Sequence, residues 1–502
     1  MNLLDKISEH VFNQPSKVAL TGKNKSINYF TLINEVKLLS SRLKQLDIKV
    51  IGIYADNTPA WVITDLAALD LEICLIPLPQ FFSPGQLKHA IKQSGITSII
   101  TDNPQQLRAL LVDQLLPDTD LLEIAGSQLS IIKTRVSCKK LPDKIIKITY
   151  TSGTTGEPKG VMLKWNQVQT VIESLSELVL ASNQDTHLTL MPLAVLLENL
   201  AGVYVSLWAG ANIILPGLST IGLTGTVAMN MERTFSAINI YKPSTLIMTP
   251  QVLQSCVEYI QHSKVDLPSL RFIALGGAPV SATLLNKAEQ LNLPVYEGYG
   301  LSECASVTTL NKPAAHKKGS VGKPLPHIDL EVSQNGEIII NNPGFSGYLD
   351  EQNIVNKTKW HTRWHTGDLG YLDEDGYLFL TGRKRNVFIT AMGRNISPEW
   401  VERELVLAPE IIQAAFFGEA LPRNTAVIVA APGCDETVIL QALEKINSSL
   451  PDYARVSHFI LAEEAFTPFN QQLSGTGRIR RQVIYQVYKR QIEQFYPQEQ
   501  LS

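Results

Sequence analysis

The sequence predicts an α/β protein with a large N-terminal domain, β-rich in its last part, and a small α+β C-terminal domain. Strand-like and helix-like segments alternate through most of the chain, as in sheets whose faces are covered by helices. Near residue 318 this alternation gives way to β-hairpin patterns, and a second, shorter alternation follows Arg383. A chain of 502 residues is too long for one compact core, which also favours two or more domains.

The composition is that of an ordinary globular protein, with 44% apolar and 18% charged residues. A net charge of −3 gives no electrostatic reason to expect a nucleic-acid partner. The five cysteines are scattered without a C-x-x-C pair, which indicates neither a disulfide framework nor a zinc site. The charged N-terminus is unlike a signal peptide, and no apolar run approaches membrane-spanning length. We therefore expect a cytoplasmic protein without a transmembrane segment.

The first 140 residues predict three helices that alternate with three strands. The helices are expected at 31–46, 61–71 and 83–95, and the strands at 50–54, 73–77 and 96–101. Ser83 and Pro84 mark the start of the third helix, because serine is a good N-cap and proline suits the first helical position.

A dense cluster of hydroxyl and glycine residues follows the strand expected at 146–150 and precedes a strand expected at 161–163. The cluster comprises Thr151, Ser152, Gly153, Thr154, Thr155 and Gly156, with Lys159 close behind. Glycines let backbone N–H groups turn toward one point, hydroxyls add uncharged donors and the lysine adds a mobile cation. Such a loop suits a polyphosphate, although it lacks the Walker spacing and a polar surface hairpin has a similar composition.

Two further turns follow expected strands in the middle of the chain. Helices are expected at 167–180 and 196–207, and strands at 186–191, 211–215, 244–248, 271–275 and 294–297. The last two strands run into two short turns, Gly276-Gly277-Ala278 and Gly298-Tyr299-Gly300. Because ligands of open α/β sheets bind beyond the carboxyl ends of the strands, we expect these turns to form the floor of a pocket.

Several polar groups near these turns would suit a nucleoside triphosphate. Tyr299 offers an aromatic face to a base, Ser302 adds a hydroxyl and Glu303 adds a carboxylate for Mg²⁺. Asp368 could accept both hydroxyls of a ribose, and Arg383 offers a fixed donor fork. Each has a purely structural alternative: core packing for the tyrosine, a turn for the aspartate and a surface ion pair for the arginine.

Two reactive residue types near these groups favour structural roles. Cys304 directly follows Glu303 but has no partnering base in view, so we expect a small buried residue rather than a nucleophile. His365 is expected to pack rather than to catalyse.

The C-terminal part predicts a helix that starts at Ser397, strands at 411–417 and 426–431, and a helix at 436–448. A last, basic helix begins near Arg478. Its cations could receive the phosphates of CoA or an acidic carrier protein, or they could form an ordinary solvated face.

The motifs, in order along the chain, resemble those of the acyl-adenylate-forming superfamily, which includes acyl-CoA synthetases, peptide-synthetase adenylation domains and luciferases. They are YTSGTTGEPKGVML, GGAP, YEGYGLSE, HTGDLGYLDEDGYLFLTGR, GRNISPEWVE and GTGRIRR, and together they cover nearly the whole chain. The stretch PLPQFFSPGQLKHAI is similar to the acyl-CoA synthetase and fatty acyl ligase branch.

The resemblance implies ATP, Mg²⁺ and CoA or phosphopantetheine as cofactors. A carboxylate would attack the α-phosphorus of ATP, pyrophosphate would leave, and a thiol would then attack the acyl-adenylate. Between the two steps a small mobile domain would rotate about a hinge. On this basis residues 1–385 form the large AMP-binding domain and residues 386–502 the small C-terminal domain.

Carried over by position, the resemblance assigns a role to each motif residue. The loop from Thr151 to Lys159 would cradle the β- and γ-phosphates, and Glu303 would bind Mg²⁺, with Ser302 replacing the commoner threonine. The adenine site would be lined by Gly276, Gly277, Ala278 and Tyr299, and Gly298 and Gly300 would also belong to the nucleotide site. Asp368 and Arg383 would hold the ribose. Gly393 would belong to the second conformation, where a pantetheine arm enters.

Three residues depart from the family pattern. Val195 stands where many relatives have histidine or an aromatic residue, and Asn386 stands at the hinge position, which is commonly aspartate. Arg478 stands where the family carries its adenylating lysine, and it keeps the charge but not the compact geometry of an ammonium. We expect the space beside Val195 to accommodate the larger guanidinium.

The acyl site is expected near an apolar stretch that includes Val195, Leu197 and Gly202. No charged residue there would pair with the α-amino group of an amino acid, so a fatty or an aromatic acid fits better. The leading hypothesis is an acid–thiol ligase that activates a fatty acid. The alternatives are a ligase for an aromatic acid and a degenerate relative that binds nucleotide or acyl chain without efficient turnover.

Overall fold

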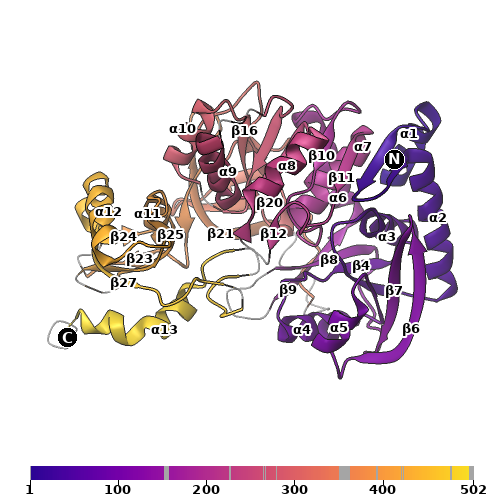
Figure 1. Cartoon of the computed structure of the whole chain (residues 1–502), viewed down its shortest axis with the longest axis horizontal. Helices are drawn as coiled ribbons and strands as arrows, with labels where there is room; N and C mark the ends of the chain where they lie inside the picture. The colour runs from indigo at the N-terminus through magenta and orange to yellow at the C-terminus, as the bar shows by residue number, and fades with distance from the viewer. Residues whose placement is uncertain are drawn as a thin grey trace.

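The protein is described by a computed structural model, which confirms the mixed α/β fold with a large N-terminal and a small C-terminal domain (Figure 1). The structure describes residues 2–151, 158–224, 228–263, 265, 267–278, 280–349, 362–391, 394–419, 421, 423–467, 469–474 and 477–496.

The first sheet carries the predicted phosphate loop at one edge. Its strand order is β6-β7-β5-β3-β4-β8-β9. The bounds are β3 (Val50–Tyr54), β4 (Cys74–Pro77), β5 (Ser98–Thr101), β6 (Leu115–Ile124), β7 (Ser127–Thr134), β8 (Ile145–Thr151) and β9 (Lys159–Lys164). Strands β5, β3, β4 and β8 run parallel, and antiparallel strands close both edges.

The second sheet carries the two glycine turns. Its strand order is β18-β17-β16-β15-β14-β10-β11-β1-β2, and the strands from β16 to β1 run parallel. The bounds are β1 (Val18–Gly22), β2 (Ser26–Asn28), β10 (Thr186–Leu188), β11 (Asn212–Leu215), β14 (Thr245–Met248), β15 (Phe272–Leu275), β16 (Val295–Tyr299), β17 (Thr309–Leu310) and β18 (Lys323–Pro324).

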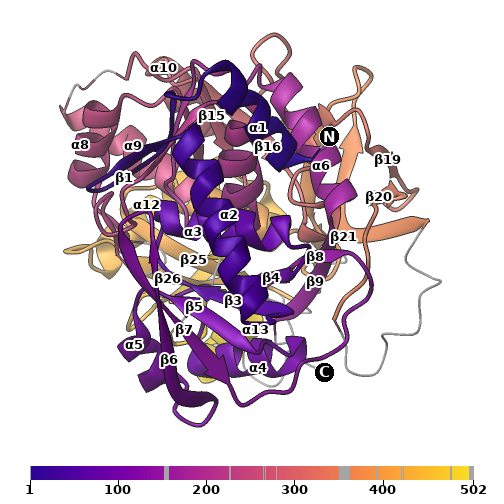
Figure 2. The ribbon, with the colours of Figure 1, turned by 90° about the vertical axis from the view of Figure 1, so that its right-hand side faces the viewer.

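Helices form a layer between the two sheets and cover both outer faces (Figure 2). The inner helices are α2 (Tyr29–Gln45), α3 (Pro59–Asp70), α6 (Trp165–Leu178), the π-helix η1 (Glu198–Tyr204) and α7 (Val205–Ala209), with α1 (Leu3–Asn13) against α2. The outer helices are α4 (Pro84–Ser94) and α5 (Pro104–Leu110) on the first sheet, and α8 (Met231–Tyr241), α9 (Pro250–Ser263) and α10 (Ala282–Gln290) on the second. A small hairpin pairs β12 (Leu223–Thr224) with β13 (Ala228–Met229).

A third, antiparallel sheet connects the large domain to the small one. It consists of β19 (Asp329–Val332), β20 (Glu337–Asn341), β21 (Arg363–Leu372) and β22 (Leu378–Arg383). The small domain packs helices on a sheet with order β25-β26-β27 and lies at the end of the molecule opposite α2 (Figure 1). Its elements are β23 (Phe388–Ile389), β24 (Asn395–Ile396), α11 (Pro398–Leu405), β25 (Ile411–Phe417), β26 (Asn424–Ala430), α12 (Glu436–Ser449), β27 (Val456–Leu461) and α13 (Arg481–Gln494).

Most predicted elements are confirmed, and local chemistry explains why. Helix α4 begins where predicted, because the Ser83 side chain accepts the Gln86 N–H in a capping box and Pro84 occupies the first turn. Gly95 ends it in the left-handed region at φ +70°. Several predictions differ in detail. The strand expected at 186–191 ends at Leu188, and the last, basic helix begins at Arg481, so Arg478 precedes it. The helix expected at 196–207 is π-helical in its first part, and the strand expected at 294–297 continues through Tyr299.

In the described part of the chain, each helix is too short or too polar to cross a membrane.

Candidate functional site

The predicted phosphate loop joins β8 to β9 in a hairpin. Thr151 and Lys159 are paired across it, so the end of one strand and the start of the next form the mouth of the loop. Ser152, Gly153, Thr154, Thr155 and Gly156 lie outside the described residues. Lys159 is exposed and therefore accessible to an anion.

Lys159 and Glu303 meet around one tyrosine. The Tyr348 hydroxyl donates to Glu303 Oε1 at 2.5 Å, and Lys159 Nζ lies over the Tyr348 ring, 5.2 Å from its centroid. Glu303 sits on a single 3₁₀ turn, Ser302–Cys304, whose backbone is held by Gln167 Nε2 donating to the Glu303 carbonyl at 2.8 Å. The predicted phosphate and metal groups therefore lie together.

The Glu303 carboxylate fits a Mg²⁺ site. It is half-buried, and within the described part of the chain its hydrogen bond from Tyr348 uses Oε1 and leaves Oε2 open. Mg²⁺ is usually held by one or two carboxylates together with substrate phosphates, rather than by a full protein cage. A single carboxylate beside a predicted phosphate loop matches that pattern.

The two glycine turns lie side by side at the carboxyl ends of β15 and β16. A Cβ at Gly276 would stand 3.5 Å from the Gly298 carbonyl oxygen and 3.8 Å from Leu197 Cδ2. Gly277 has a left-handed φ of +87°, which favours glycine. At Gly300 a Cβ would stand 1.7 Å from the Ser306 carbonyl oxygen, so the backbone there leaves no room for a side chain.

Asp368 connects the predicted adenine and ribose residues. Its Oδ2 accepts the Tyr299 hydroxyl at 2.8 Å, and its Oδ1 pairs with Arg383 Nε at 2.8 Å. Asp368 and Arg383 face each other in the register of β21 and β22, which explains the fixed ion pair. Burial and the negative charge of Asp368 raise the pKa of Tyr299 well above its usual value, so the phenol stays protonated.

The small domain brings Arg478 to the glycine turn of β15. Arg478 Nε donates to the Gly277 carbonyl at 3.2 Å. The side chain keeps an open face to solvent, yet desolvation by its neighbours and the like charges of Arg383 and Arg385 lower the pKa of Arg478 to about 10. The guanidinium therefore remains charged at neutral pH.

A second contact supports the same domain arrangement, because Gln254 Nε2 on α9 donates to the Val406 carbonyl after α11 at 3.2 Å. Asn386, at the predicted hinge, donates through its side chain to Glu399 Oε1, and its backbone N–H bonds the Arg383 carbonyl at 2.9 Å. Gly393 lies outside the described residues.

The residues of the predicted acyl stretch differ in how far they are buried. Val195 and Leu197 are half-buried, and Leu197 approaches Gly276 as described above. Gly202 is buried inside η1 and faces a hydrogen bond of 2.7 Å between Glu198 Oε1 and His187 Nε2. A Cβ at Gly202 would lie 2.3 Å from Glu198 Oε1 and 2.5 Å from His187 Nε2, so this position is filled by a polar pair.

The remaining sequence candidates occupy ordinary positions. Ser302 is half-buried at the start of the 3₁₀ turn, and Ala278 is exposed after Gly277. Cys304 is buried, as expected, and burial raises the pKa of its thiol. His365 is mostly exposed and faces Glu337 Oε2 at 3.3 Å.

Sequence reasoning missed Tyr348, Glu198, His187 and Lys147. Of these, only the lysine left a visible signal, since it interrupts an apolar strand between Ile146 and Ile148.

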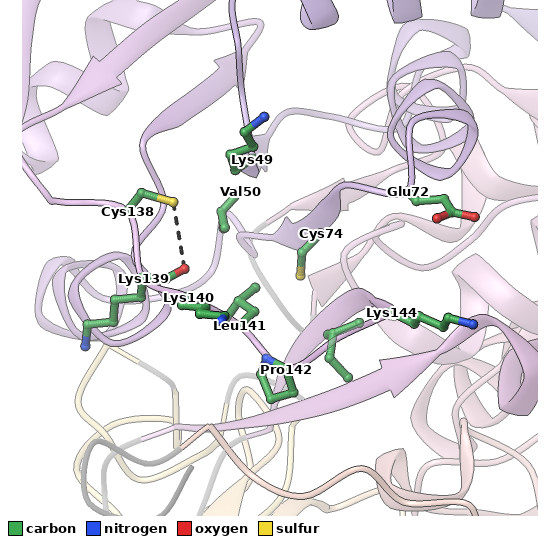
Figure 3. A pocket seen from close by; sticks show the side chains of 11 residues that line it. Lys49, Val50, Glu72, Cys74, Cys138, Lys139, Lys140, Leu141, Pro142 and Lys144 are labelled. Carbon is green, nitrogen blue, oxygen red and sulfur yellow. Dashed lines mark hydrogen bonds between the residues drawn. The ribbon is translucent and has the colours of Figure 1, made fainter. Parts of the chain in front are cut away.

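A separate hollow of about 410 Å³ lies at the opposite end of β8 (Figure 3). Val50, Cys74 and Ile145, the first residues of β3, β4 and β8, line it together with four lysines, Lys49, Lys139, Lys140 and Lys144. The candidate site lies beyond the carboxyl end of β8, so this hollow is not part of it.

Comparison with known proteins agrees with this geometry. The family model described as "AMP-binding enzyme" matches residues 7–349. The chain belongs to the AMP-binding enzyme family. The model described as "AMP-binding enzyme C-terminal domain" matches residues 385–500, so both domains of this AMP-binding enzyme have a family counterpart.

Relatives of this AMP-binding enzyme include CoA ligases for different acids. Long-chain-fatty-acid–CoA ligase 6 of Rattus norvegicus is 25% identical over 94% of this chain and 82% of its own length. Oxalate–CoA ligase of Arabidopsis thaliana is 26% identical over 94% of this chain and 96% of its own. The crystal structure of the anthranilate CoA ligase AuaEII in complex with anthranoyl-AMP has the same fold, with a TM-score of 0.80, 19% identity and 97% coverage of both chains.

Proposed function

We propose that this AMP-binding enzyme activates a carboxylic acid with ATP, releases pyrophosphate and transfers the acyl group from acyl-AMP to a thiol. The observation that carries the proposal is the convergence of Tyr299, Asp368 and Arg383 with Arg478 of the small domain around the Gly276–Gly277 turn. These groups supply an aromatic face, a ribose acceptor and two cations around one turn, as an adenylating site requires.

Each residue has a defined part in the proposed first step. Asp368 accepts the ribose hydroxyls, and Arg383 keeps that carboxylate in place through their ion pair. Arg478 provides positive charge where the acid and the α-phosphate approach each other, which favours the transition state. Lys159 and the backbone of the loop from Thr151 bind the β- and γ-phosphates. Mg²⁺, held by Glu303, would neutralise part of the charge on the leaving pyrophosphate.

We propose a fatty acid as the substrate class. Val195 and Leu197 are apolar and half-buried, and Leu197 approaches Gly276. The buried Glu198 carboxylate that follows them is already bonded to His187 and to the Met191 N–H, so it offers no free anion to an amino acid. The fatty-acid ligase among the relatives supports this choice, whereas the oxalate and anthranilate ligases keep a compact or aromatic acid as the alternative. The acceptor thiol is that of CoA or of a carrier-protein phosphopantetheine. CoA is favoured because the relatives described above are CoA ligases.

The second step requires a different domain arrangement. We propose that residues 386–502 rotate about Asn386, which removes Arg478 from the Gly276–Gly277 turn and brings Gly393 to the thiol entrance. The contacts that would break include the hydrogen bonds from Arg478 to Gly277 and from Gln254 to Val406, together with the packing of Leu407 against the core around α9. The two hydrogen bonds are single contacts of a type that costs little to exchange.

A binding-only protein is the second candidate function. Two departures favour it, namely Val195 in the acyl stretch and Arg478 in place of a lysine. The deciding experiment is pyrophosphate exchange into ATP with a panel of fatty, aromatic and short dicarboxylic acids. Exchange that depends on one class of acid supports the ligase and identifies its substrate. ATP binding without exchange for any acid would establish the binding-only function instead.

A further inference from the structure

Tyr348 contacts both charged side chains of the candidate phosphate site. Its hydroxyl donates to Glu303 Oε1 at 2.5 Å, and its ring lies under Lys159 Nζ, 5.2 Å from the centroid. A single side chain thus touches a carboxylate through its polar end and an ammonium through its aromatic face.

The backbone of Tyr348 is fixed beside the phosphate hairpin. Tyr348 forms an isolated antiparallel bridge with Val161 of β9. On either side of this bridge, the Met162 N–H donates to the Gly347 carbonyl at 3.1 Å and the Leu349 N–H to the Gly160 carbonyl at 2.8 Å. The segment that carries Tyr348 is therefore attached to the strand that begins with Lys159.

The ring of Tyr348 also packs against two aromatic side chains, independently of Glu303 and Lys159. It packs edge-to-face on Phe345, with centroids 5.0 Å apart, and on Trp364 at 6.1 Å. Side chains locked by packing make good supports for functional groups, because their direction does not depend on the ligand.

We propose that Tyr348 is a positioning residue of the adenylation site, whose hydroxyl orients the Glu303 carboxylate and whose ring holds the Lys159 ammonium. This inference rests on the proposed function, which takes Glu303 toward the metal and Lys159 toward the phosphates. Two opposite charges that were free to move would pair with each other and would have to separate when a nucleotide binds. A hydrogen bond and a cation–π contact hold them without neutralising either charge.

A purely structural role predicts something different. If Tyr348 only fills space, its replacement lowers stability and changes nucleotide and metal binding in proportion. Positioning predicts instead that the two contacts can be removed one at a time, with separate effects on metal and nucleotide.

Three variants of the full-length protein separate these cases. Tyr348→Phe removes the hydroxyl and keeps the ring, and Tyr348→Leu removes both. Tyr371→Phe is the matched control, because Tyr371 is 51% exposed and stacks on Phe379 at 5.1 Å. The probes are Mn²⁺, followed by electron paramagnetic resonance, and a non-hydrolysable ATP analogue, followed by calorimetry with and without metal. Circular dichroism checks the fold of each variant.

We expect Tyr348→Phe to bind the analogue normally without metal and to lose about tenfold in Mn²⁺ affinity in its presence, as when a carboxylate ligand loses its supporting hydrogen bond. Tyr348→Leu should also weaken metal-free binding, and Tyr371→Phe should match wild type. Unchanged Mn²⁺ affinity in Tyr348→Phe overturns the role of the hydroxyl. Equal metal-free binding in Tyr348→Phe and Tyr348→Leu overturns that of the ring.

Two further outcomes are also decisive. If wild type binds neither the analogue nor its Mn²⁺ complex, the proposed function itself fails, and this inference falls with it. If Tyr348→Leu does not fold, the coupling of Tyr348 to Glu303 is tested instead by comparing Glu303→Gln with the double variant Glu303→Gln/Tyr348→Phe. There, removal of the Tyr348 hydroxyl should leave Mn²⁺ affinity unchanged, and a further loss would refute the coupling of the two residues.

Discussion

Lys147 and Asp65 form an ion pair in the interior of the protein, with Nζ 2.8 Å from Oδ2 and neither side chain more than 2% exposed. Lys147 lies in the middle of β8 and Asp65 on α3. Asn199 and Tyr204 of η1 also donate to Asp65 Oδ2, each at 2.8 Å. Burial lowers the pKa of Lys147, and the facing carboxylate opposes this effect. The pair connects the strand before the phosphate loop with the helix beside the acyl stretch.

We expect Lys147→Met to destabilise the protein strongly. It leaves a buried carboxylate without its cation, and breaking a buried pair in this way typically costs about 3–5 kcal/mol. The double variant Lys147→Met/Asp65→Leu should recover much of the loss, because no buried charge remains. Urea unfolding measures both. Lys49→Met is the control, since Lys49 forms an exposed pair with Asp47, and a loss no larger than in this control would contradict the prediction.

This lysine also shows where sequence reasoning stops. The alternation of Ile146, Ile148 and Tyr150 predicted the strand correctly, but it placed Lys147 on the opposite face, which an ordinary amphipathic strand turns to solvent. Here that face meets α3 and η1, so the lysine is buried against an aspartate 82 positions earlier. Partners so distant in sequence leave no periodic signal.

In the candidate site, too, some residues could be predicted from the sequence and others could not. The positions of Gly276 after β15 and of Tyr299 at the carboxyl end of β16 were predictable from the strand pattern. That these ends bind the ligand follows from the general rule for parallel strands and stays a prediction. Tyr348 was not, because it follows a glycine in an irregular segment and its partner Glu303 is 45 positions away. The π-helical turn at Glu198 was also missed, since hydrophobic spacing does not distinguish it from an α-helix.

Gly202→Ala should destabilise the protein although alanine favours helices. The new Cβ would overlap the Glu198–His187 hydrogen bond, and displacing a buried polar pair costs about 1–3 kcal/mol. Gly85→Ala in α4 is the matched control, because a Cβ there meets nothing closer than Ser83 Oγ at 3.9 Å. Thermal unfolding compares the two, and equal midpoints would refute the prediction. A test of acyl-chain length is therefore better made with Leu197→Trp than with a larger residue at Gly202, where the Glu198–His187 pair leaves no room.

Glu297 should make the protein less stable as pH rises. Burial raises the pKa of Glu297 from 4.5 to about 7, although the Gly319 N–H donates to it and Arg403 lies nearby. The folded state thus binds this proton more tightly than the unfolded state, so stability falls between pH 4.5 and 7, by about 3 kcal/mol in total.

The matching variant is Glu297→Gln, which is neutral at every pH and keeps an acceptor for Gly319. Urea unfolding at pH 4 and pH 8 should give equal stability for variant and wild type at the lower pH, and greater stability for the variant at the higher. Glu444→Gln, exposed on α12, should follow wild type at both values. If the free energy of unfolding changed with pH in the same way for wild type and Glu297→Gln, the prediction that ionisation of buried Glu297 destabilises the protein would be refuted.

Lys159→Ala and Glu303→Ala should each abolish most adenylation while the fold remains intact. Both charges act on the triphosphate and its metal in the proposed reaction, and losing one such transition-state contact typically slows a reaction by about 10²–10³-fold. Pyrophosphate exchange measures the rate, and Lys23→Ala, in an exposed turn, is the control. Near-normal acyl-adenylate formation in either variant would remove these residues from the proposed site.

Arg478→Ala should affect the two half-reactions unequally. In the present arrangement its guanidinium reaches the Gly277 carbonyl at 3.2 Å, beside the predicted adenine site, and it remains charged at neutral pH. In the proposed reaction a cation there lowers the barrier where carboxylate and α-phosphate approach. In the proposed second arrangement of the small domain, Arg478 would lie away from the site and would not contribute.

We therefore expect Arg478→Ala to lose about 10²-fold or more in acyl-adenylate formation, while thiol transfer from a supplied acyl-adenylate stays within a fewfold of wild type. Arg478→Lys should keep much of the first step, because it retains a positive charge at this position. Arg490→Ala, exposed on α13, controls for a general loss of positive charge. Rapid-quench measurement of each half-reaction decides the matter. Equal losses in both steps would mean that Arg478 supports the domain rather than the chemistry, and a wild type that adenylates no acid would favour the binding-only function.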